Sequence, residues 1–322
     1  MTAFVVRRLA QTLVVILLLS YFSYYLMTLM PGDPVDLMIT ANPDITAADI
    51  ERLRELHGLD QPVWVRYWNW ASNILAGDLG YSRTYRIPVT DLLGPRLFNT
   101  FLLSVAALVV SLLIAIPLGI WAALRKGSRV DYFVNLFAFA GISVPSFWIA
   151  IVLILLFAVY VPLFPAGGTA SVAFEMSTWD RISDRAHHLI LPVISLSFLT
   201  IGTYVRYTRA AMLEVLSNDY IRTARAKGLG PWRILIMHGF RNALIPLITV
   251  FAISFSTLFS GAIITETVFA YQGVGQLVFE SILSNDFNVA MVAFMISVSM
   301  VLVMNLVADL AYGVADPRIT YQ

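Results

Sequence analysis

The chain has 322 residues, of which 59% are hydrophobic and only 13% are charged, and its mean hydropathy is +0.78. Soluble domains carry about 25% charged and about 45–50% apolar residues, so this composition excludes a free-standing soluble enzyme. The net charge of +1 gives no basic excess for binding nucleic acid, and the absence of cysteine excludes disulfides, thiolate metal sites and a thiol nucleophile.

The apolar residues form continuous blocks, and a helix needs roughly 20 such residues to cross a bilayer. Six blocks are predicted to be transmembrane helices, at residues 9–30, 97–124, 132–161, 189–205, 243–265 and 287–308. The third is long enough to bend, and Ser143-Val144-Pro145 marks its expected break. Because the blocks do not alternate between polar and apolar residues, they indicate a helical bundle and not a β-barrel.

The distribution of charge orients the predicted bundle. With the N-terminus inside, the inner segments hold thirteen of the 21 basic residues but only five of the 20 acidic ones. The short loop at residues 125–129 is the clearest indicator, because basic residues in short loops mark the cytoplasmic side. We therefore expect both termini in the cytoplasm. The inner basic residues are Arg7, Arg8, Arg125, Lys126, Arg129, Arg206, Arg209, Arg222, Arg225, Lys227, Arg233, Arg241 and Arg318.

Two segments are expected outside the membrane, residues 31–96 and residues 162–188. In the first, Thr46 is the predicted N-cap of a short helix, with Asp49 as its acidic partner three residues later. Four aromatic residues follow at helix-like intervals. They are interpreted either as an interfacial belt or small local core, or as a docking surface for an outside partner. These residues are Trp64, Tyr67, Trp68 and Trp70.

The largest cytoplasmic segment, residues 206–242, is the main candidate site. Ser217, Asn218 or Asp219 can cap a short helix there, and Gly228 is suited to end it in the left-handed conformation. Downstream, Pro231 suits the first turn of a second helix.

The predicted short helix has only about two turns and is marginal alone in water, so something must hold it. A packed surface is expected from four residues, namely Tyr220, Ile221, Ala224 and Leu229, with basic residues around it. The pattern leaves two interpretations open. The helix either inserts into a groove of a soluble partner or lies on the lipid surface.

Two stretches of this segment are recognisable, Asp219-Tyr220-Ile221-Arg222-Thr223-Ala224-Arg225-Ala226-Lys227-Gly228-Leu229 and Arg241-Asn242-Ala243-Leu244-Ile245-Pro246. Together they resemble the cytoplasmic coupling loop of ABC importer permeases, and within these the first (B-type) subunit of the peptide and nickel branch. Similar motifs run along the whole chain: Pro31-Gly32-Asp33-Pro34, Ala76-Gly77-Asp78-Leu79-Gly80, Leu191-Pro192, Glu266-Thr267-Val268-Phe269, Gly273-Val274-Gly275 and the ending Asp309-Leu310 to Asp316-Pro317-Arg318-Ile319.

The loop departs from the general permease pattern at one point. That pattern begins with Glu-Ala-Ala, six to four residues before its glycine, whereas this chain has Arg222, Thr223 and Ala224 there. The form is typical of the peptide branch. It leaves no glutamate for a contact with an ATPase, so a basic rim from Arg222 and Lys227 is expected in its place.

The resemblance implies an all-α integral membrane protein of six transmembrane helices with the type I ABC importer permease fold. It divides the chain into an N-terminal transmembrane helix (1–30), an extracytoplasmic segment (31–96), a permease core (97–310) with the coupling loop (206–242), and a cytoplasmic tail (311–322). The implied partners are a second homologous permease, two ABC ATPase subunits, an extracytoplasmic solute-binding protein and the lipid of a prokaryotic cytoplasmic membrane.

The resemblance also places ATPase coupling on seven residues of the loop: Asp219, Tyr220, Arg222, Ala224, Lys227, Gly228 and Trp232. Asp219 is expected to cap the short helix, Tyr220 and Trp232 to pack, and the two basic residues to pair with acidic groups. The sequence contains no Gly-x-x-x-x-Gly-Lys-Ser/Thr phosphate loop. ATP and Mg are therefore expected on the partner ATPase subunits, with no cofactor on this chain. The expected cargo is a di- or oligopeptide, and nickel, glutathione and oligosaccharides are alternatives within the same resemblance.

A stand-alone secondary transporter is the competing class. Such proteins need ionisable groups near the middle of the bilayer, and here only Glu266 and Asp309 lie near a span, each at an end where it is expected to reach water. A polar stripe on the fifth span is interpreted either as lining for a pathway or as helix packing. It consists of Ser254, Thr257 and Ser260.

A membrane-embedded enzyme is the third class. His187 and His188 are adjacent, so they point in different directions on a helix and lack the i, i+4 spacing of a metal site. No nucleophile with a matching base is found in the pattern. The sequence therefore predicts no catalytic residue and no metal site.

Overall fold

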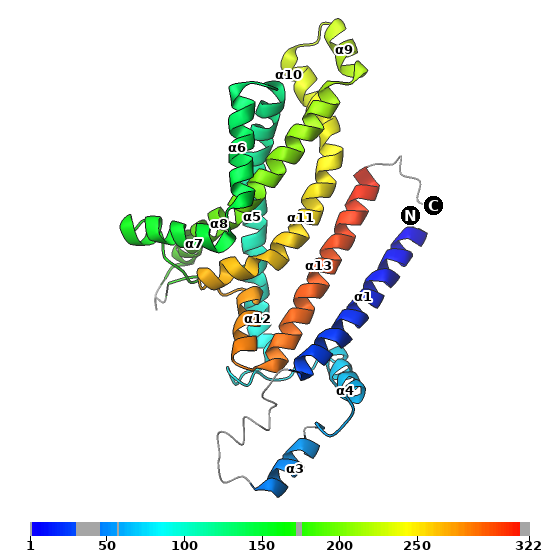
Figure 1. The fold of residues 1–322 in the computed structure, drawn as a ribbon, viewed down its shortest axis with the longest axis vertical. Coiled ribbons are helices and arrows are strands. Elements are labelled where there is room, and N and C mark those ends of the chain that lie inside the picture. Colours follow the sequence, from blue (N-terminus) through cyan, green and yellow to red (C-terminus); the bar gives the residue numbers. More distant parts are fainter. Residues whose placement is uncertain (1, 30–45, 57, 172–175, 316–322) are drawn as a thin grey trace.

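The computed structural model describes residues 2–29, 46–56, 58–171 and 176–315, although within its helices the side chains of residues 2–5, 47–48, 56, 245, 249, 252–261 and 308–315 are not described. Every regular element in this part of the chain is a helix (Figure 1). The long helices are α1 (Thr2–Thr28), α5 (Val89–Leu124), α8 (Thr178–Leu216), α11 (Arg241–Val268) and α13 (Phe287–Ala315), and a bent pair is formed by α6 (Arg129–Ser143) and α7 (Ser146–Ile154), which continues as the π-helix η1 (Leu155–Tyr160).

Within the described ranges, four helices are long and apolar enough to cross a membrane, and α6 with α7 and η1 makes a fifth span when the bent pair is taken together. The bend of 97° falls at the expected place. Val144 is extended and Pro145 precedes the first turn of α7, because the residue before a proline avoids helical geometry. The remaining predicted span, residues 243–265, lies within α11, which packs against α5, α8 and α13.

The short helices gather at the two ends of the bundle (Figure 1). At one end, called the α9 end, lie α9 (Asp219–Ala226), α10 (Pro231–Arg233) with the π-helix η2 (Ile234–Phe240), and the turn between α5 and α6. At the opposite end, called the α12 end, lie α3 (Ala47–Leu56), α4 (Val63–Leu75) and α12 (Val274–Leu283). Helix α1 begins and α13 ends toward the α9 end.

Small residues let the helices approach α8 closely. A Cβ added to Gly202 would lie 2.3 Å from the carbonyl oxygen of Ala138 on α6, and one added to Gly119 of α5 would lie 2.6 Å from Cβ of Thr208. Such small-residue contacts are how helices associate in lipid, where no hydrophobic effect holds them together. Helix α8 is therefore the element on which α5 and α6 are assembled.

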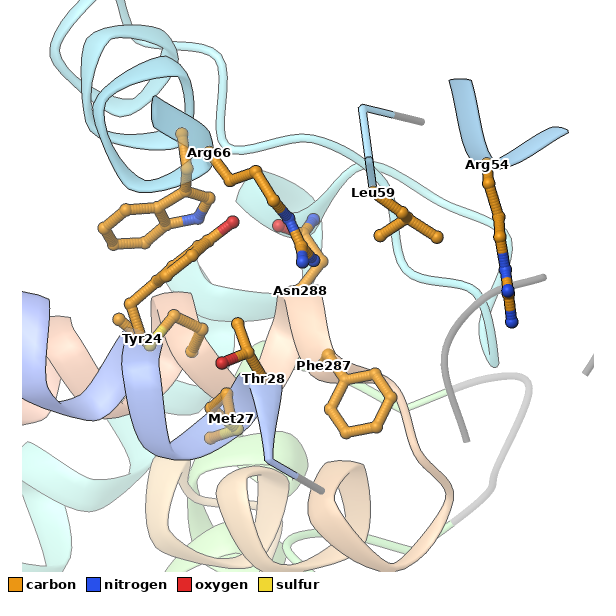
Figure 2. A pocket seen from close by; sticks show the side chains of 10 residues that line it. Tyr24, Met27, Thr28, Arg54, Leu59, Arg66, Phe287 and Asn288 are labelled. Carbon is orange, nitrogen blue, oxygen red and sulfur yellow. The ribbon is translucent and has the colours of Figure 1, made fainter. Parts of the chain in front are cut away.

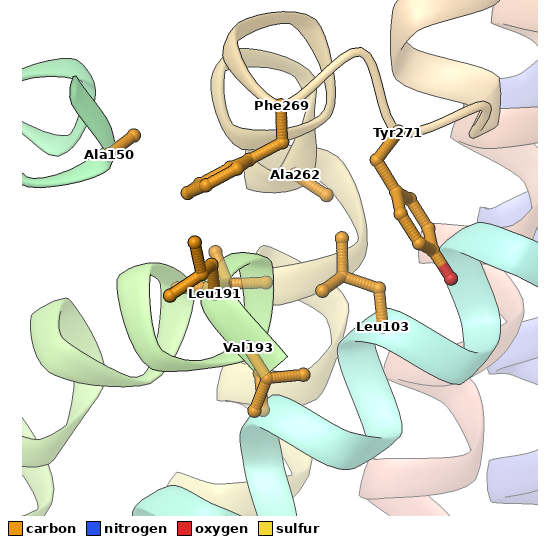
Figure 3. Packing of buried hydrophobic residues seen from close by; sticks show 9 residues of the cluster. Leu103, Ala150, Leu191, Val193, Ala262, Phe269 and Tyr271 are labelled. Carbon is orange, nitrogen blue, oxygen red and sulfur yellow. The ribbon is translucent and has the colours of Figure 1, made fainter. Parts of the chain in front are cut away.

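A buried apolar cluster joins α5 and α8 to the residues that follow α11 (Figure 3). Leu103 of α5 and Leu191 of α8 meet Phe269, the residue that follows α11, and each of these side chains is at most 1% exposed. Tyr271 lies beside them and is 3% exposed. The cluster joins three long helices with the connection that leads to α12.

Helix α8 is longer than the fourth predicted span, which was placed at residues 189–205. It begins eleven residues earlier, at Thr178, because Ser177 caps it by accepting a hydrogen bond from the Asp180 amide at 3.2 Å. Its polar first turns also hold the preceding loop, since the Asp184 carboxylate accepts hydrogen bonds from the Ser171 amide and hydroxyl, both at 2.7 Å. Hydropathy registers only the apolar middle of such a helix.

Helix α3 confirms the predicted capping box. The Asp49 amide donates to the Thr46 hydroxyl at 3.3 Å, and the Thr46 amide donates back to the Asp49 carboxylate at 3.1 Å. The resulting hydrogen bonds lower the pKa of Asp49. The short helix predicted for the outer segment is therefore present, over residues 47–56.

The loop before α5 is bound to the turn between α12 and α13. Asp286, only 2% exposed, accepts hydrogen bonds from the Ser82 hydroxyl at 2.6 Å and the Thr84 amide at 2.9 Å. Asn288 donates to the carbonyl of Leu79 at 3.0 Å. Gly80 has a φ of +71°, and a Cβ there would lie 2.6 Å from the Asn288 amide nitrogen. In the Ala76-to-Gly80 motif, Gly80 thus allows the loop backbone to approach the Asn288 side chain closely.

Glu266 does not reach water, contrary to its expected position. It is fully buried, and its carboxylate accepts hydrogen bonds from the Thr100 hydroxyl at 2.6 Å and the Gln276 amide at 3.0 Å. It therefore caps the N-terminus of α12, where free amides and the helix dipole favour an anion. A Cβ on Gly273 would lie 2.1 Å from this carboxylate. The glycine is needed for the backbone to come so close.

Replacing Glu266 by Ala is expected to lower the free energy of unfolding by roughly 3 kcal/mol, because it leaves buried donors on α5 and α12 without their acceptor. The measurement is thermal unfolding of the purified protein in detergent. Glu214→Ala, at an exposed glutamate of α8, is the control and should stay within about 0.5 kcal/mol of the parent. Equal unfolding temperatures for the two variants would contradict the capping role.

Candidate functional site

Helix α9 lies beyond the ends of the long helices, between α8 and α11 (Figure 1). Asn218 occupies the N-cap position of α9, but its side chain makes no capping hydrogen bond. The end of α9 is a Schellman motif. Gly228 has a φ of +73°. Its amide donates to the Arg225 carbonyl at 3.0 Å, and the Leu229 amide donates to the Ala224 carbonyl at 3.3 Å. The predicted termination at Gly228 is confirmed.

One face of α9 packs against the rest of the segment. Ile221 is fully buried, Ala224 is 5% exposed, and both contact Ile234 of η2, with Leu229 completing the cluster. These positions are three residues apart on the helix and so lie on the same face. Because a helix of only eight residues is marginal in water, this small cluster is what fixes α9.

Two roles predicted for residues of α9 and α10 are wrong for the isolated chain. Asp219 does not cap the helix, because it is the first helical residue and lies 2.8 Å from the Arg222 guanidinium, in an ion pair that is largely exposed. Tyr220 and Trp232 do not pack within the chain, since they are 41% and 73% exposed. Lys227 is also exposed. Aromatic and charged side chains thus face outward together.

Helix α9 is connected to the bundle through η2. Pro231 begins the second helix as predicted, at its first position. Gly239 of η2 lies against Met212 and Leu216 of α8, at 3.5 and 3.6 Å from where its Cβ would be. Met212 belongs to a cluster in which α5, α8 and α11 meet. A displacement of α9 would therefore reach three long helices through packed side chains.

A partly buried ion pair near this segment was not found from the sequence. Asp131 of α6 is 5% exposed and accepts two hydrogen bonds from Arg209 of α8, at 2.6 Å from Nε and 2.8 Å from Nη2. Its carboxylate also accepts from the Gly127 amide at 2.9 Å and from Asn135 at 2.8 Å. The pair ties the α5–α6 turn to α8. Because 78 residues separate its members in the chain, no local spacing could have indicated it.

The four outer aromatic residues divide into two kinds. Tyr67 is 9% exposed, contacts Tyr21, Tyr24 and Trp70, and shares a hydrogen bond of 2.7 Å with Ser20 of α1. Trp64 and Trp68 are 60% and 59% exposed. The local core and the exposed aromatic surface are therefore both present, on different members of the set.

The side chains of Ser254, Thr257 and Ser260 lie outside the described residues, as does that of Asp309. The motif at residues 31–34 and the ending at 316–319 also fall outside the description. His187 and His188 do point to different partners, the first to the Leu163 carbonyl at 2.8 Å and the second to the Asp184 carbonyl at 2.9 Å.

Comparison with known protein families gives two adjoining matches. Residues 1–104 match the N-terminal region described for membrane components of binding-protein-dependent transport systems, and residues 115–321 match the family described as "binding-protein-dependent transport system inner membrane component". The second match alone covers more than half of the chain.

Full-length relatives and a solved structure agree with these matches. The chain is 39% identical to the oligopeptide transport system permease protein AppB of Bacillus subtilis and 35% identical to the dipeptide transport system permease protein DppB of Escherichia coli, with 100% of each chain covered. Its fold is similar to a chain of the MetNI methionine ABC transporter in an inward-facing conformation. The TM-score is 0.56 at 18% identity, covering 70% of this chain and 97% of that one.

Replacing Ile221 by Ala is expected to loosen α9, because it opens a cavity in the only cluster that holds the helix within the described segment. A cost of roughly 2 kcal/mol corresponds to more than about tenfold faster amide exchange, measured over residues 219–226 by hydrogen–deuterium exchange. Tyr220→Ala, at the exposed neighbouring position, is the control. Equal exchange in the two variants would show that the cluster does not anchor the helix.

Proposed function

Because the chain belongs to the family of binding-protein-dependent transport system inner membrane components, we propose that it forms, with a second permease subunit, the translocation path of an importer of di- and oligopeptides. It is itself a multi-pass permease subunit of an ABC importer with the type I permease fold. Two ATPase subunits dock at the α9 end and bind the ATP and Mg, and a solute-binding protein delivers cargo at the α12 end. The peptide cargo is supported by the full-length relatives named for oligopeptide and dipeptide transport.

The placement of α9 carries this proposal. The helix projects past the bundle and is fixed on one side only, while Tyr220, Trp232, Arg222 and Lys227 are exposed on the segment. Aromatic anchors surrounded by charges suit insertion into a groove of a partner protein. Of the two interpretations open from the sequence, this placement favours the groove over the lipid surface.

The path of coupling runs from α9 through η2 into α8 and α11. When ATP closes the two ATPase subunits, α9 moves with the groove that holds it, and the packed contacts at Ile234 and Gly239 pass the displacement on. Packed helices transmit such shifts as rigid bodies. The bundle then changes between inward-facing and outward-facing states.

The orientation follows from charge. The α9 end contains the α5–α6 turn, with Arg125, Lys126 and Arg129, and the loop with Arg222, Arg225 and Lys227. Basic residues favour the cytoplasmic side. We accordingly place the α9 end and both chain termini in the cytoplasm, and α3, α4 and α12 toward the outer side of the inner membrane.

Replacing Gly228 by Pro is expected to uncouple ATP hydrolysis from uptake. Proline fixes φ near −65° and lacks the amide that bonds Arg225, so the Schellman motif is lost at a cost of ~3 kcal/mol or more. The readout is the amount of peptide taken up per ATP hydrolysed by the whole transporter in proteoliposomes. Gly230→Ala is the matched control, because Gly230 has an ordinary φ and no atom within 4 Å of an added Cβ. Normal coupling in the proline variant would refute the role of α9.

The exposed tryptophans of α4 test the docking side. Trp64→Ala and Trp68→Ala together are expected to weaken stimulation of ATPase activity by the solute-binding protein. Because Trp68 stacks on Tyr67, with 5.9 Å between the ring centroids, Trp64→Ala alone is the variant expected to leave the unfolding temperature unchanged. Tyr67→Ala should instead lower the unfolding temperature, because Tyr67 packs against α1. The measurements are stimulated ATPase rates and thermal unfolding. Unchanged stimulation in the double variant would remove α4 from the docking surface.

A further inference from the structure

Two cavities lie one above the other in the seam between α1, α4 and α13. The outer cavity, of about 420 Å³, is lined by Tyr24, Met27 and Thr28 of α1, by Arg66 and Trp70 of α4, and by Phe287, Asn288 and Met291 of α13, with Arg54 on its far side (Figure 2). The inner cavity, of about 280 Å³, is lined by α4, by Ile16, Leu17 and Ser20 of α1, and by Val292, Met295, Ile296 and Ser299 of α13. Trp70 lines both.

The order of the cavities is the same on both long helices. Along α1, the residues of the inner cavity come about two turns before those of the outer cavity. Helix α13 runs the opposite way, and along it the residues of the inner cavity come after those of the outer cavity. At 1.5 Å of rise per residue, their centres are on the order of 10 Å apart along the bundle axis. That is the spacing between a lipid headgroup and the upper part of its acyl chains.

The two cavities differ in chemistry. The outer one holds the Arg66 guanidinium beside the Tyr24 hydroxyl, together with the Arg54 guanidinium and the Asn288 amide (Figure 2). Guanidinium groups match the geometry of phosphate oxygens. The inner cavity is almost entirely apolar, with Ile16, Leu17 and Ile296 among its walls. The pair therefore suits an amphiphile with an anionic head.

The surroundings place this seam at the membrane surface. Leu13 and Leu18 of α1 are 58% and 66% exposed, as expected of a face that meets acyl chains. Next to Tyr24, which lines the outer cavity, Tyr25 of α1 is 43% exposed. Exposed aromatic residues of this kind mark the headgroup level of a bilayer. The outer cavity then lies at the depth of the phosphates and the inner one at the depth of the chains.

We propose that this seam binds one phospholipid, with its phosphate between Arg54 and Arg66 and an acyl chain in the inner cavity. The lipid fills the two cavities left where α1 and α4 meet α13. Helix α1 is otherwise little buried, because only 6% of its most apolar stretch lies inside the described structure. The bound lipid thus holds the first helix against the bundle.

The test is lipid retention by the full-length chain in detergent, measured by native mass spectrometry during titration with long-chain phosphatidylglycerol. One lipid is expected to remain bound, and Arg66→Gln should weaken its binding about tenfold, because a charge-assisted hydrogen bond is lost. Arg52→Gln is the matched control, at an exposed arginine of α3 that lines neither cavity. Equal retention by the two variants would overturn the proposal.

A second variant tests the chain cavity. Ala71→Phe places a ring in the inner cavity and should reduce binding of long-chain phosphatidylglycerol while leaving a short-chain analogue unaffected. Its thermal unfolding temperature shows whether it is folded, and if it is not, the arginine comparison decides alone. Inorganic phosphate should neither displace the lipid nor reproduce its stabilisation. If phosphate alone matches the lipid, the site is a simple anion site and the proposal fails.

Discussion

The structure depends on the close approach of α5 and α6 to α8, made where Gly119 and Gly202 leave no room for side chains. In lipid, apolar side chains gain little by leaving their solvent, so helices are held by fitted contact and by hydrogen bonds between them. Both occur here, because Ser111 of α5 and Thr200 of α8 share a hydrogen bond of 2.6 Å within the same interface. Helix α8 can consequently extend past the apolar layer at both ends, and its two polar ends position the loop before it and the segment that carries α9.

Helix α11 joins the two ends of the molecule. At one end it continues from η2, which holds α9, and at the other it carries Glu266, whose carboxylate fixes the start of α12. Helix α12 is followed by the turn in which Asp286 binds the loop before α5. Displacement of α9 thus has a continuous route, through packed side chains and buried hydrogen bonds, to the end where the proposed binding protein docks. Each packed or hydrogen-bonded contact along this route has few alternative geometries. Such contacts favour movement between discrete states over gradual bending.

Much of this arrangement was predictable from local sequence, and the rest was not for identifiable reasons. The apolar blocks, the break at Pro145, the capping box at Thr46 and the turn at Gly228 are governed by neighbours within a few residues. The burial of Glu266 depends on Thr100, which is 166 residues away in the chain. The Asp131–Arg209 pair likewise joins residues that are 78 positions apart. The ends of α8 were misjudged because hydropathy reports lipid contact, whereas helix continuation depends on caps. The four outer aromatic residues differ in burial because only one side of α4 faces α1.

The basic residues of the proposed coupling loop have an energetic consequence. In the free chain Arg222 is paired with Asp219 in water, where such a pair contributes at most about 1 kcal/mol. Its value to the fold is therefore small, and the same is true of the exposed Lys227. Burial in an acidic groove would change this, because desolvated and hydrogen-bonded charges discriminate strongly between partners and speed their encounter. Tyr220 and Trp232 would then supply the apolar anchors. The residues that contribute least to the stability of this chain are thus the ones through which it would recognise an ATPase subunit, whereas Ile221 and Ala224 only hold that surface in place.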